Sequence, residues 1–371
     1  MRTLRRKFLL VAALLVVTGI VMVYSTTAIY AQEQYKDAAY FLKRHLFYLA
    51  VGLLLSGWVL SLDPQRIRRW TKPFVGVTLL LLAAVMVPGM GHRVSGASRW
   101  FRLGAFSVQP SEFAQLAIIL YLADVLSRKR RVLENFFQGV LPPLVVLGVT
   151  LLLIVVEPDL GTAVALGVVA LLLFFIAGVR RRVLVSLLLL AVPLVVGLVI
   201  LKPYRVHRVM AYLNPWADPE GIGFQLIQSL VALGSGGVMG VGLGESRQKL
   251  FYLPAAHTDF IFSVIGEELG LVGGTVVLIL LGFLFWYGIR LALQSPDAFG
   301  AFAGLGVIFL LALETLVHVG VTTGAIPTKG LPLPFISYGG TALVVNLMSV
   351  AVLLNLARPR QVVVLTHGGA G

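Results

Sequence analysis

Asp259 is a carboxylate at the point where a long polar stretch ends and a strongly hydrophobic segment begins. The residues at 260–266 are mostly apolar, whereas His257 and Thr258 before it are polar. A carboxylate at such a boundary is placed to accept a proton from a substrate carried by a lipid. Alternatively, Thr258 and Asp259 only cap the helix that begins there. The choice depends on which elements hold this residue and on which side of a membrane.

The composition predicts the surroundings of this carboxylate. The chain has 371 residues, of which 58% are hydrophobic and 12% charged, and its mean hydropathy is +0.93. This leaves too little polar side-chain surface to cover a water-soluble globule of that size. Long runs of Leu, Val and Ala favour helices, which satisfy their own backbone hydrogen bonds in lipid. We therefore predict an all-α polytopic membrane protein, with residues 1–371 forming a single integral membrane domain.

Ten hydrophobic segments are long enough to cross a bilayer, since about 20 apolar residues are needed per helix. They are 8–28, 45–62, 74–90, 110–126, 139–156, 160–179, 183–201, 259–287, 300–323 and 336–356. The net charge is +14, and basic clusters come before the first segment and after every second one, at 2–7, 66–72, 128–131, 180–182 and 358–360. This is the positive-inside pattern of a polytopic protein, so the charge indicates contact with membrane lipid and not with nucleic acid.

The same pattern predicts a sidedness. Both termini are expected in the cytoplasm of a protein that crosses the cell membrane several times. The segments 29–44, 91–109, 202–258 and 324–335 are then extracytoplasmic. The one long loop, 202–258, lies between the seventh and eighth spans and ends at the predicted base. Residues 223–237 within this loop are expected to form a short amphipathic helix ending in glycines; re-entry of this helix into the bilayer is the alternative.

Several cations lie in these external segments, against the positive-inside trend. Arg93 and Arg99 accompany Trp100 in the segment 91–109. Exposed arginines there favour binding of a phosphate, with simple contact to lipid headgroups as the alternative. Arg205 and Arg208 begin the long loop among aromatic residues, as expected at a headgroup interface.

A glycine-rich run at 236–244 precedes Lys249. Glycines let backbone amides approach an anion, so this run could bind a lipid-linked diphosphate with Lys249 supplying charge. It does not match a nucleotide-binding P-loop. The alternative is that the glycines merely turn the loop.

Ionisable residues within the spans are candidates for function because charges in hydrocarbon are costly. They are Glu112, Glu267, Glu268, Glu314 and His318. Glu314 and His318 are one helical turn apart and are expected to form a structural pair, since a metal would need more ligands. Asp159, which follows Glu157 in a turn, is expected either at a functional site or as the N-cap of the sixth span. No metal-binding residues are predicted, and the absence of cysteine excludes thiolate sites.

Six stretches that contain these residues resemble the SEDS family (shape, elongation, division and sporulation) of peptidoglycan polymerases. They include Gly96-Ala-Ser-Arg-Trp-Phe101 and are found at 96–101, 109–112, 157–163, 234–244, 253–270 and 330–340. Together they extend over nearly the whole chain and are far more specific than any single motif. The stretches 246–254 and 326–340 are closer to the division-type member FtsW than to the elongation-type member RodA.

The resemblance implies ten transmembrane helices and the use of lipid II, a disaccharide-pentapeptide on undecaprenyl diphosphate. It assigns the essential acidic residue to Asp259. It assigns the surroundings of the substrate groove to Arg99, Trp100 and the loop 202–258. The full set of predicted substrate-binding residues is Arg93, Arg99, Trp100, Glu112, Arg205, Arg208, Lys249, His257 and Ser337.

One position departs from the family pattern. Gln115 stands where the family usually has a lysine, one turn after Glu112. An ion pair within the membrane would form between those two positions. Glu112 therefore lacks its usual partner, and it is either protonated or paired with another cation.

Together with the resemblance, these residues predict a glycosyltransferase that polymerises lipid II at the outer face of the cell membrane, for septal synthesis in cell division. Asp259 would be the base and the external cations would stabilise the departing diphosphate. No cofactor is required, although a divalent cation stays open as an additional counter-charge. The partners that the resemblance implies are lipid II, the undecaprenyl-linked nascent glycan, a class B penicillin-binding protein and other divisome proteins. The alternatives are a lipid II flippase, an elongation-type polymerase, and a scaffold for the transpeptidase.

Overall fold

The structure is a computed structural model that describes residues 2–94, 97–104, 106–128, 133–249 and 252–358. Parts of the segments named above, including Gly96, lie outside this part of the chain, at 95–96, 105, 129–131, 250–251 and 359–360.

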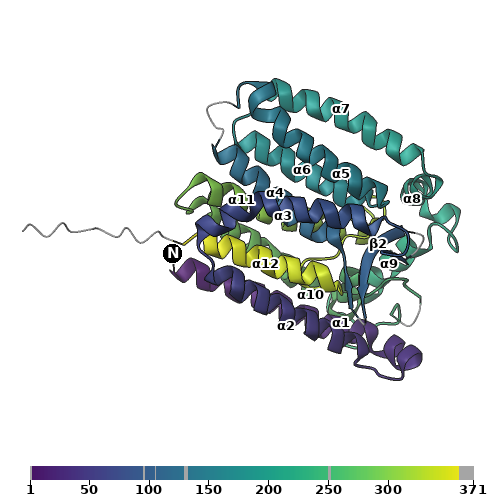
Figure 1. Ribbon diagram of the computed structural model, residues 1–371. Helices are drawn as coiled ribbons and strands as arrows, with labels where there is room; N and C mark the ends of the chain where they lie inside the picture. Colours follow the sequence, from purple (N-terminus) through teal and green to yellow (C-terminus); the bar gives the residue numbers. More distant parts are fainter. Residues whose placement is uncertain (1, 95–96, 105, 129–132, 250–251, 359–371) are drawn as a thin grey trace, which may run out of the picture.

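The described residues form a bundle of long helices, with the strands and the helices α8 and α9 gathered at one end (Figure 1). The long helices are α1 (Arg2–Tyr35), α2 (Tyr40–Ser61), α3 (Pro64–Val85), α4 (Pro110–Arg128), α5 (Leu141–Val156), α6 (Leu160–Ile176), α7 (Arg181–Ile200), α10 (Ile261–Leu293), α11 (Ala298–Thr322) and α12 (Gly340–Leu356). The short elements are β1 (His92–Val94), β2 (Ala97–Leu103), β3 (Phe106–Val108), η1 (Phe136–Val140), α8 (Pro203–Leu213), η2 (Pro215–Ala217) and α9 (Phe224–Gly236).

The ten long helices occupy the positions of the ten predicted spans, so the chain is a polytopic helical membrane protein. Seven of the described helical segments are long and apolar enough to cross a bilayer. The apolar helices α6 and α12 have 17 residues each. The helix α3 is less apolar because four basic residues lie in its first three turns.

The largest differences from the predicted boundaries are at the start of α3 and the end of α1. Helix α3 begins at Pro64, ten residues before the predicted start of the third span. The reason is local, because the Asp63 side chain accepts a hydrogen bond from the backbone N–H of Gln65 and Pro64 suits the first helical position. The basic cluster at 66–72 therefore lies on a helix and not in a loop. Helix α1 also continues past the predicted end of the first span, as far as Tyr35.

The segment after α3 is a small antiparallel sheet, which the all-α prediction did not include. Its strand order is β1-β2-β3, with Arg93 opposite Ser98 and Arg102 opposite Ser107. The Tyr48 hydroxyl on α2 donates to the carbonyl of Ser107 and accepts from its N–H, at 3.0 and 2.9 Å. These bonds attach the sheet to the helical bundle.

The core lies where α4, α11 and α12 meet, and nearly every residue of α4 and α12 is buried. Helix α12 packs most extensively against α2, α11 against α4 and α10, and α1 against α10. Helix α7 lies at the edge of the bundle (Figure 1) and has no buried residue. Its apolar side chains therefore face lipid, which explains why it could be predicted from hydropathy alone.

Helix α9 confirms the short helix predicted within the loop 202–258. It packs against α10 so closely that a Cβ at Gly236 would lie 2.0 Å from the carbonyl oxygen of Gly266. The Ser229 hydroxyl lies 2.6 Å from that of Ser263 and donates to the carbonyl of Thr322. These buried hydrogen bonds fix α9 against the beginning of α10 and the end of α11.

The two ends of the described chain lie at the same end of the bundle. The Arg5 guanidinium near the start of α1 donates to the carbonyl of Leu354 near the end of α12, at 2.9 Å. The sheet and helices α8 and α9 lie at the opposite end (Figure 1). This arrangement agrees with an even number of crossings.

Candidate active site

Asp259 lies in a loop that is attached to a second loop far along the chain. The Ser337 hydroxyl donates to the carbonyl of Thr258 at 2.7 Å and accepts from the N–H of Leu333 at 2.8 Å. The backbone N–H of Tyr338 donates to the carbonyl of His257 at 2.9 Å. These bonds hold the start of α10 against the segment before α12, and Ser337 therefore positions Asp259 through the backbone.

Asp259 does not cap α10. The helix begins at Ile261, its N-cap residue is Phe260, and no side chain caps it. The partly buried carboxylate instead lies over Gly330, where an added Cβ would be 2.8 Å from its Oδ2 atom. Burial raises the pKa of Asp259, an effect that the neighbouring Thr258 and Arg208 reduce. The capping interpretation of Asp259 was therefore wrong, and the carboxylate is free of a helix-capping role.

Two cations and a second carboxylate surround this position. Arg208 on α8 interacts electrostatically with Asp259, and its Nη1 lies 3.4 Å from the carbonyl of Thr328. Lys329 crosses over the start of α6, where a Cβ at Gly161 would meet its Nζ at 3.4 Å. Asp159 interacts with both Lys329 and Asp259. Burial lowers the pKa of Lys329, although Asp159 opposes this change. The structure thus brings together charges from four separate segments of the chain.

Asp159 also caps α6, as one of its two interpretations predicted. Its Oδ1 accepts from the N–H of Thr162 at 3.2 Å, and its Oδ2 accepts from the Thr162 hydroxyl at 2.9 Å. The cap fixes the carboxylate beside Lys329 at the positive end of the helix dipole. Its structural and functional interpretations are therefore compatible.

Arg99 supports this turn from the sheet. Its Nε and Nη2 donate to the carbonyls of Glu157 and Pro158, both at 2.7 Å. The guanidinium thereby binds two carbonyls that have no hydrogen-bond partner within helix α5 because they follow its last turn. Arg99 was predicted to bind substrate, and the structure gives it contacts that position the turn containing Asp159.

The Glu157 side chain in this turn is buried without a partner. It is 1% exposed, and neither carboxylate oxygen bonds to any described residue. Burial raises the pKa of Glu157 to about 8; the nearby Asp159 adds to this, and Arg99 opposes it. Glu157 is therefore mainly protonated at neutral pH, which reduces negative charge next to Asp159.

The other residues that were predicted to bind substrate from the outer segments have different surroundings. Arg205 is buried, and it donates to the carbonyl of Leu198 at 2.6 Å and to the Tyr204 hydroxyl at 2.9 Å, which joins α8 to the end of α7. Trp100 is partly buried on β2. Arg93 lies on β1, and its side chain falls outside the described part of the structure.

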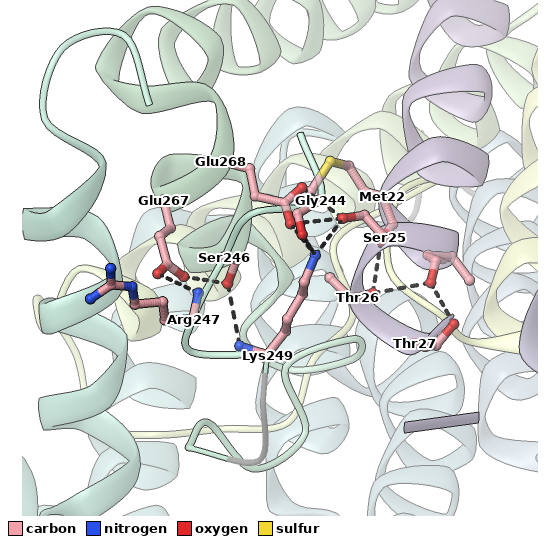
Figure 2. A network of polar contacts seen from close by, with 11 residues as sticks. Met22, Ser25, Thr26, Thr27, Gly244, Ser246, Arg247, Lys249, Glu267 and Glu268 are labelled. Atoms are coloured by element: carbon pink, nitrogen blue, oxygen red, sulfur yellow. Dashed lines mark hydrogen bonds and ion pairs between the residues drawn. The ribbon is translucent and has the colours of Figure 1, made fainter. Parts of the chain in front are cut away.

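Lys249 belongs to a buried network at the junction of α1 and α10 (Figure 2). Its Nζ forms an ion pair with Glu268 at 2.9 Å and donates to the carbonyl of Gly244 at 2.5 Å. Ser25 on α1 donates to the same carboxylate. In the same network, Glu267 accepts from the Ser246 hydroxyl and the Arg247 N–H. The contacts of Lys249 are thus with Glu268 and its neighbours, and the charges around Asp259 come from other residues.

The glycine-rich run before Lys249 is hydrogen-bonded to a break in α10. The N–H groups of Val241 and Gly242 donate to the carbonyls of Glu267 and Glu268, both at 3.0 Å. Gly270 interrupts the helix with φ of +68°, a conformation that strongly favours glycine. Since these two amides are occupied, the structure supports the turn interpretation of the run over the phosphate-binding one.

His257 and the intramembrane residues complete the predicted set. The His257 ring packs against Phe41 and Tyr338, with centroids 5.5 and 5.7 Å apart, and burial lowers the pKa of His257 to about 4. Gln115, which replaces the usual lysine, donates to Glu112 at 3.4 Å. Glu112 therefore has a neutral partner there, and the Asp159 carboxylate before the neighbouring helix α6 acts on it electrostatically.

The Glu314 and His318 pair is not formed. His318 bonds instead through Nδ1 to the carbonyl of Leu331 at 2.8 Å, and its Nε2 has no partner among the described residues. This bond attaches α11 to the segment before α12, which is also the segment that positions Asp259 through Ser337.

The chain matches the FtsW/RodA/SpoVE family, described as cell cycle proteins, over residues 5–362. The chain belongs to this family. It is similar to the stage V sporulation protein E of Bacillus subtilis, with 44% identity over 349 residues, which are 94% of this chain and 95% of the relative. It is also similar to a probable peptidoglycan glycosyltransferase FtsW of Trichlorobacter lovleyi, with 45% identity over 94% of the relative and 96% of this chain.

Solved structures show the same fold. One, from a peptidoglycan synthase complex described as coordinating polymerization and crosslinking, has a TM-score of 0.76 and 32% identity, covering 94% of this chain and 96% of that one. Another, the rod shape determining protein RodA of Thermus thermophilus, has a TM-score of 0.71 and 28% identity, covering 94% and 95%. The RodA-like fold of the chain is therefore established over nearly its whole length.

Lys329 is the residue at this site that the sequence did not single out. It lies just before the stretch 330–340, in a short loop between two apolar helices. The sequence does contain a signal for Lys329. Lysines usually set membrane orientation in the loops that carry the basic clusters, and Lys329 is predicted to lie in a loop on the opposite side, so its charge needs another explanation.

Replacing Gly330 by Ala tests the contact with the carboxylate. The new Cβ would lie 2.8 Å from Asp259 Oδ2 and must displace the carboxylate. Because catalytic groups tolerate little misplacement, we expect at least about a tenfold loss of the enzymatic activity that depends on Asp259. Gly339→Ala is the matched control, because its Cβ has no neighbour closer than 3.4 Å. Equal activities of the two variants, measured at equal thermal stability, would contradict the proposed contact.

Glu157→Gln should change the pH dependence of stability. The folded-state pKa of Glu157 is about 8 against an ordinary value of 4.5. The free energy of unfolding of the wild type is therefore highest below pH 4.5 and falls as the pH rises toward 8. Gln cannot ionise, and the variant should gain about 2 °C or more in Tm relative to wild type between pH 5 and pH 8. Exposed Glu220→Gln serves as control. A constant difference between variant and wild type across this range would refute the protonated state.

Proposed function

We propose that this chain polymerises lipid II into glycan strands at the outer face of the cytoplasmic membrane, with Asp259 as the general base. The observation that carries the proposal is the geometry of Asp259. It is a partly buried carboxylate, free of any capping role, held by two attached loops beside Arg208 and Lys329. The relatives named peptidoglycan glycosyltransferase FtsW support the reaction type.

The reaction joins a sugar hydroxyl to an anomeric carbon. The 4-hydroxyl of one substrate attacks the anomeric carbon of the other, a new C–O bond forms, and the bond to the lipid diphosphate breaks. Asp259 accepts the hydroxyl proton. The diphosphate leaves as an anion, so cations stabilise it and no acid is needed to protonate it. A single carboxylate is then sufficient, in contrast to the pair used by glycosidases.

Arg208 and Lys329 are the cations that we assign to the diphosphate. Arg208 is exposed on α8, and Lys329 is partly exposed above the start of α6. A helix N-terminus with a lysine beside it favours an anion. Asp159 attracts Lys329 electrostatically and offsets part of the cost of its partial burial. In this scheme Ser337 fixes the two loops, and Arg99 fixes the turn that contains Asp159.

The cellular role that we propose is septal. Relatives named FtsW and stage V sporulation protein E are 44 to 45% identical to this chain, whereas the RodA structure is 28% identical. We further propose cytoplasmic termini, a single membrane domain and a class B penicillin-binding protein as partner. The similar peptidoglycan synthase complex supports the partner, because polymerization and crosslinking are coordinated there.

Asp259→Asn tests the base directly. Purified protein with labelled lipid II should yield glycan ladders on a gel, and the variant should be at least about 100-fold slower because it cannot accept the proton. Glu220→Gln, which changes an exposed carboxylate in the same long loop, should behave as wild type. Ladders from Asp259→Asn at the wild-type rate would remove the proposed base. Lipid II translocation in liposomes without any polymerisation would instead favour a flippase.

The pH profile tests the assignment of Arg208. Because burial raises the pKa of Asp259, the base is lost on acidification at a higher pH than for an ordinary aspartate. Arg208 opposes this rise, so Arg208→Gln should move the acidic limb of kcat/KM to still higher pH. Lys202→Gln, an exposed change at the start of the same helix, should leave the limb in place. Identical profiles for both variants would show that Arg208 does not act on this carboxylate.

A further inference from the structure

A pocket of about 290 Å³ opens at the end of the bundle opposite to Asp259. It lies between the start of α3, the end of α4 and the start of α11. The residues that line it include Gln65, Arg68, Arg69, Arg128, Asp297 and Phe299. Three arginines from two helices therefore face one cavity, and the glycosyltransferase chemistry proposed above uses none of them.

Two of these arginines are held rigidly by one buried carboxylate. The Nε atoms of Arg68 and Arg128 donate to Oδ1 of Asp124, at 2.6 and 2.7 Å. Arg68 also donates to the Ser127 hydroxyl at 2.9 Å and lies over the ring of Phe299. Asp124 is 1% exposed and can neutralise only one of its two partners. The pair therefore presents a net positive charge with donors left over, in a fixed arrangement.

The third arginine is available for a ligand. Arg69 is exposed and forms no hydrogen bond or ion pair with any residue that the structure describes. Asp297 is the other acidic residue at the pocket, and its Oδ1 accepts from the N–H of Gly300 as the N-cap of α11. With Asp124 and Asp297 counted against the three arginines, the described residues at the pocket carry a charge of about +1, which favours an anion.

Exposed tryptophans place this pocket at the membrane surface. Trp70 on α3 directly follows Arg69 in the sequence and is 67% exposed, and Trp58 near the end of α2 is 59% exposed. Tryptophan concentrates at the level of lipid headgroups. A basic cavity between transmembrane helices at that level fits a headgroup phosphate. We propose that this pocket binds the phosphate of an anionic membrane lipid, with Arg69, Arg68 and Arg128 as its donors.

The experiment compares lipids and matched arginine variants. The detergent-purified full chain is freed of bound lipid and titrated with phosphatidylglycerol or phosphatidylcholine, and bound lipid is counted by native mass spectrometry. Wild type should prefer phosphatidylglycerol. Arg69→Gln should weaken that binding about tenfold, as expected for one charge-assisted hydrogen bond. Arg66→Gln is the matched control, because Arg66 is exposed on the same helix but does not line the pocket.

Three further measurements make the result decisive. Arg69→Lys keeps the charge and should recover part of the affinity, and equal melting temperatures of all variants without lipid exclude misfolding as the cause. Equal weakening by Arg66→Gln and Arg69→Gln would overturn the proposal, because it would indicate a diffuse basic surface. Equal binding of the two lipids would also overturn it. Displacement of the lipid by inorganic phosphate at similar concentration would assign the pocket to a soluble anion and refute the headgroup.

Discussion

The site depends on the attachment of the loop before α10 to the loop before α12. Ser337 bridges the carbonyl of Thr258 and the N–H of Leu333, and Tyr338 bonds to the carbonyl of His257. Irregular backbone is tolerated near a membrane only where its polar groups are satisfied within the protein. Each loop satisfies groups of the other, so neither could keep its shape alone. Asp259 and Lys329 are brought together by this mutual dependence.

Around these loops, the fold uses helix ends to place charge. Asp159 caps α6, Arg99 binds the carbonyls at the end of α5, and Lys329 lies over the turn between them. The contacts of Asp159 and Arg99 satisfy backbone groups that helix termini leave unpaired, and together they fix the turn that places the Asp159 carboxylate. Glu157 in the same turn is neutral because its side chain is buried. A charged Glu157 would be costly to bury and would also oppose the binding of an anion nearby.

Hydropathy was sufficient to predict the helices but not the contacts between loops. Helix α7 faces lipid along its whole length, and its apolar run alone locates it. Helix α3 was misplaced by ten residues because its first turns are basic and its start depends on a cap at Asp63. The sheet β1-β2-β3 was missed because it is held by Tyr48 on a distant helix. Asp259 itself was found from its position, whereas the burial of Lys249 and the approach of Lys329 depend on residues far away in sequence.

Cations have different roles at the two ends of the bundle. The number of charges in the sequence could not predict these roles, because they depend on the contacts of each side chain. At the end that contains Asp259, Arg99 and Arg205 bind carbonyls, Lys249 binds Glu268, and Arg208 and Lys329 face the carboxylates of the site. At the other end, one buried aspartate orders two arginines and leaves charge in excess. A cation whose donors are consumed by backbone carbonyls shapes a site, whereas a cation that shares one carboxylate with a second cation keeps part of its charge and can still bind a ligand. The same residue type therefore has opposite consequences, which only the contacts distinguish.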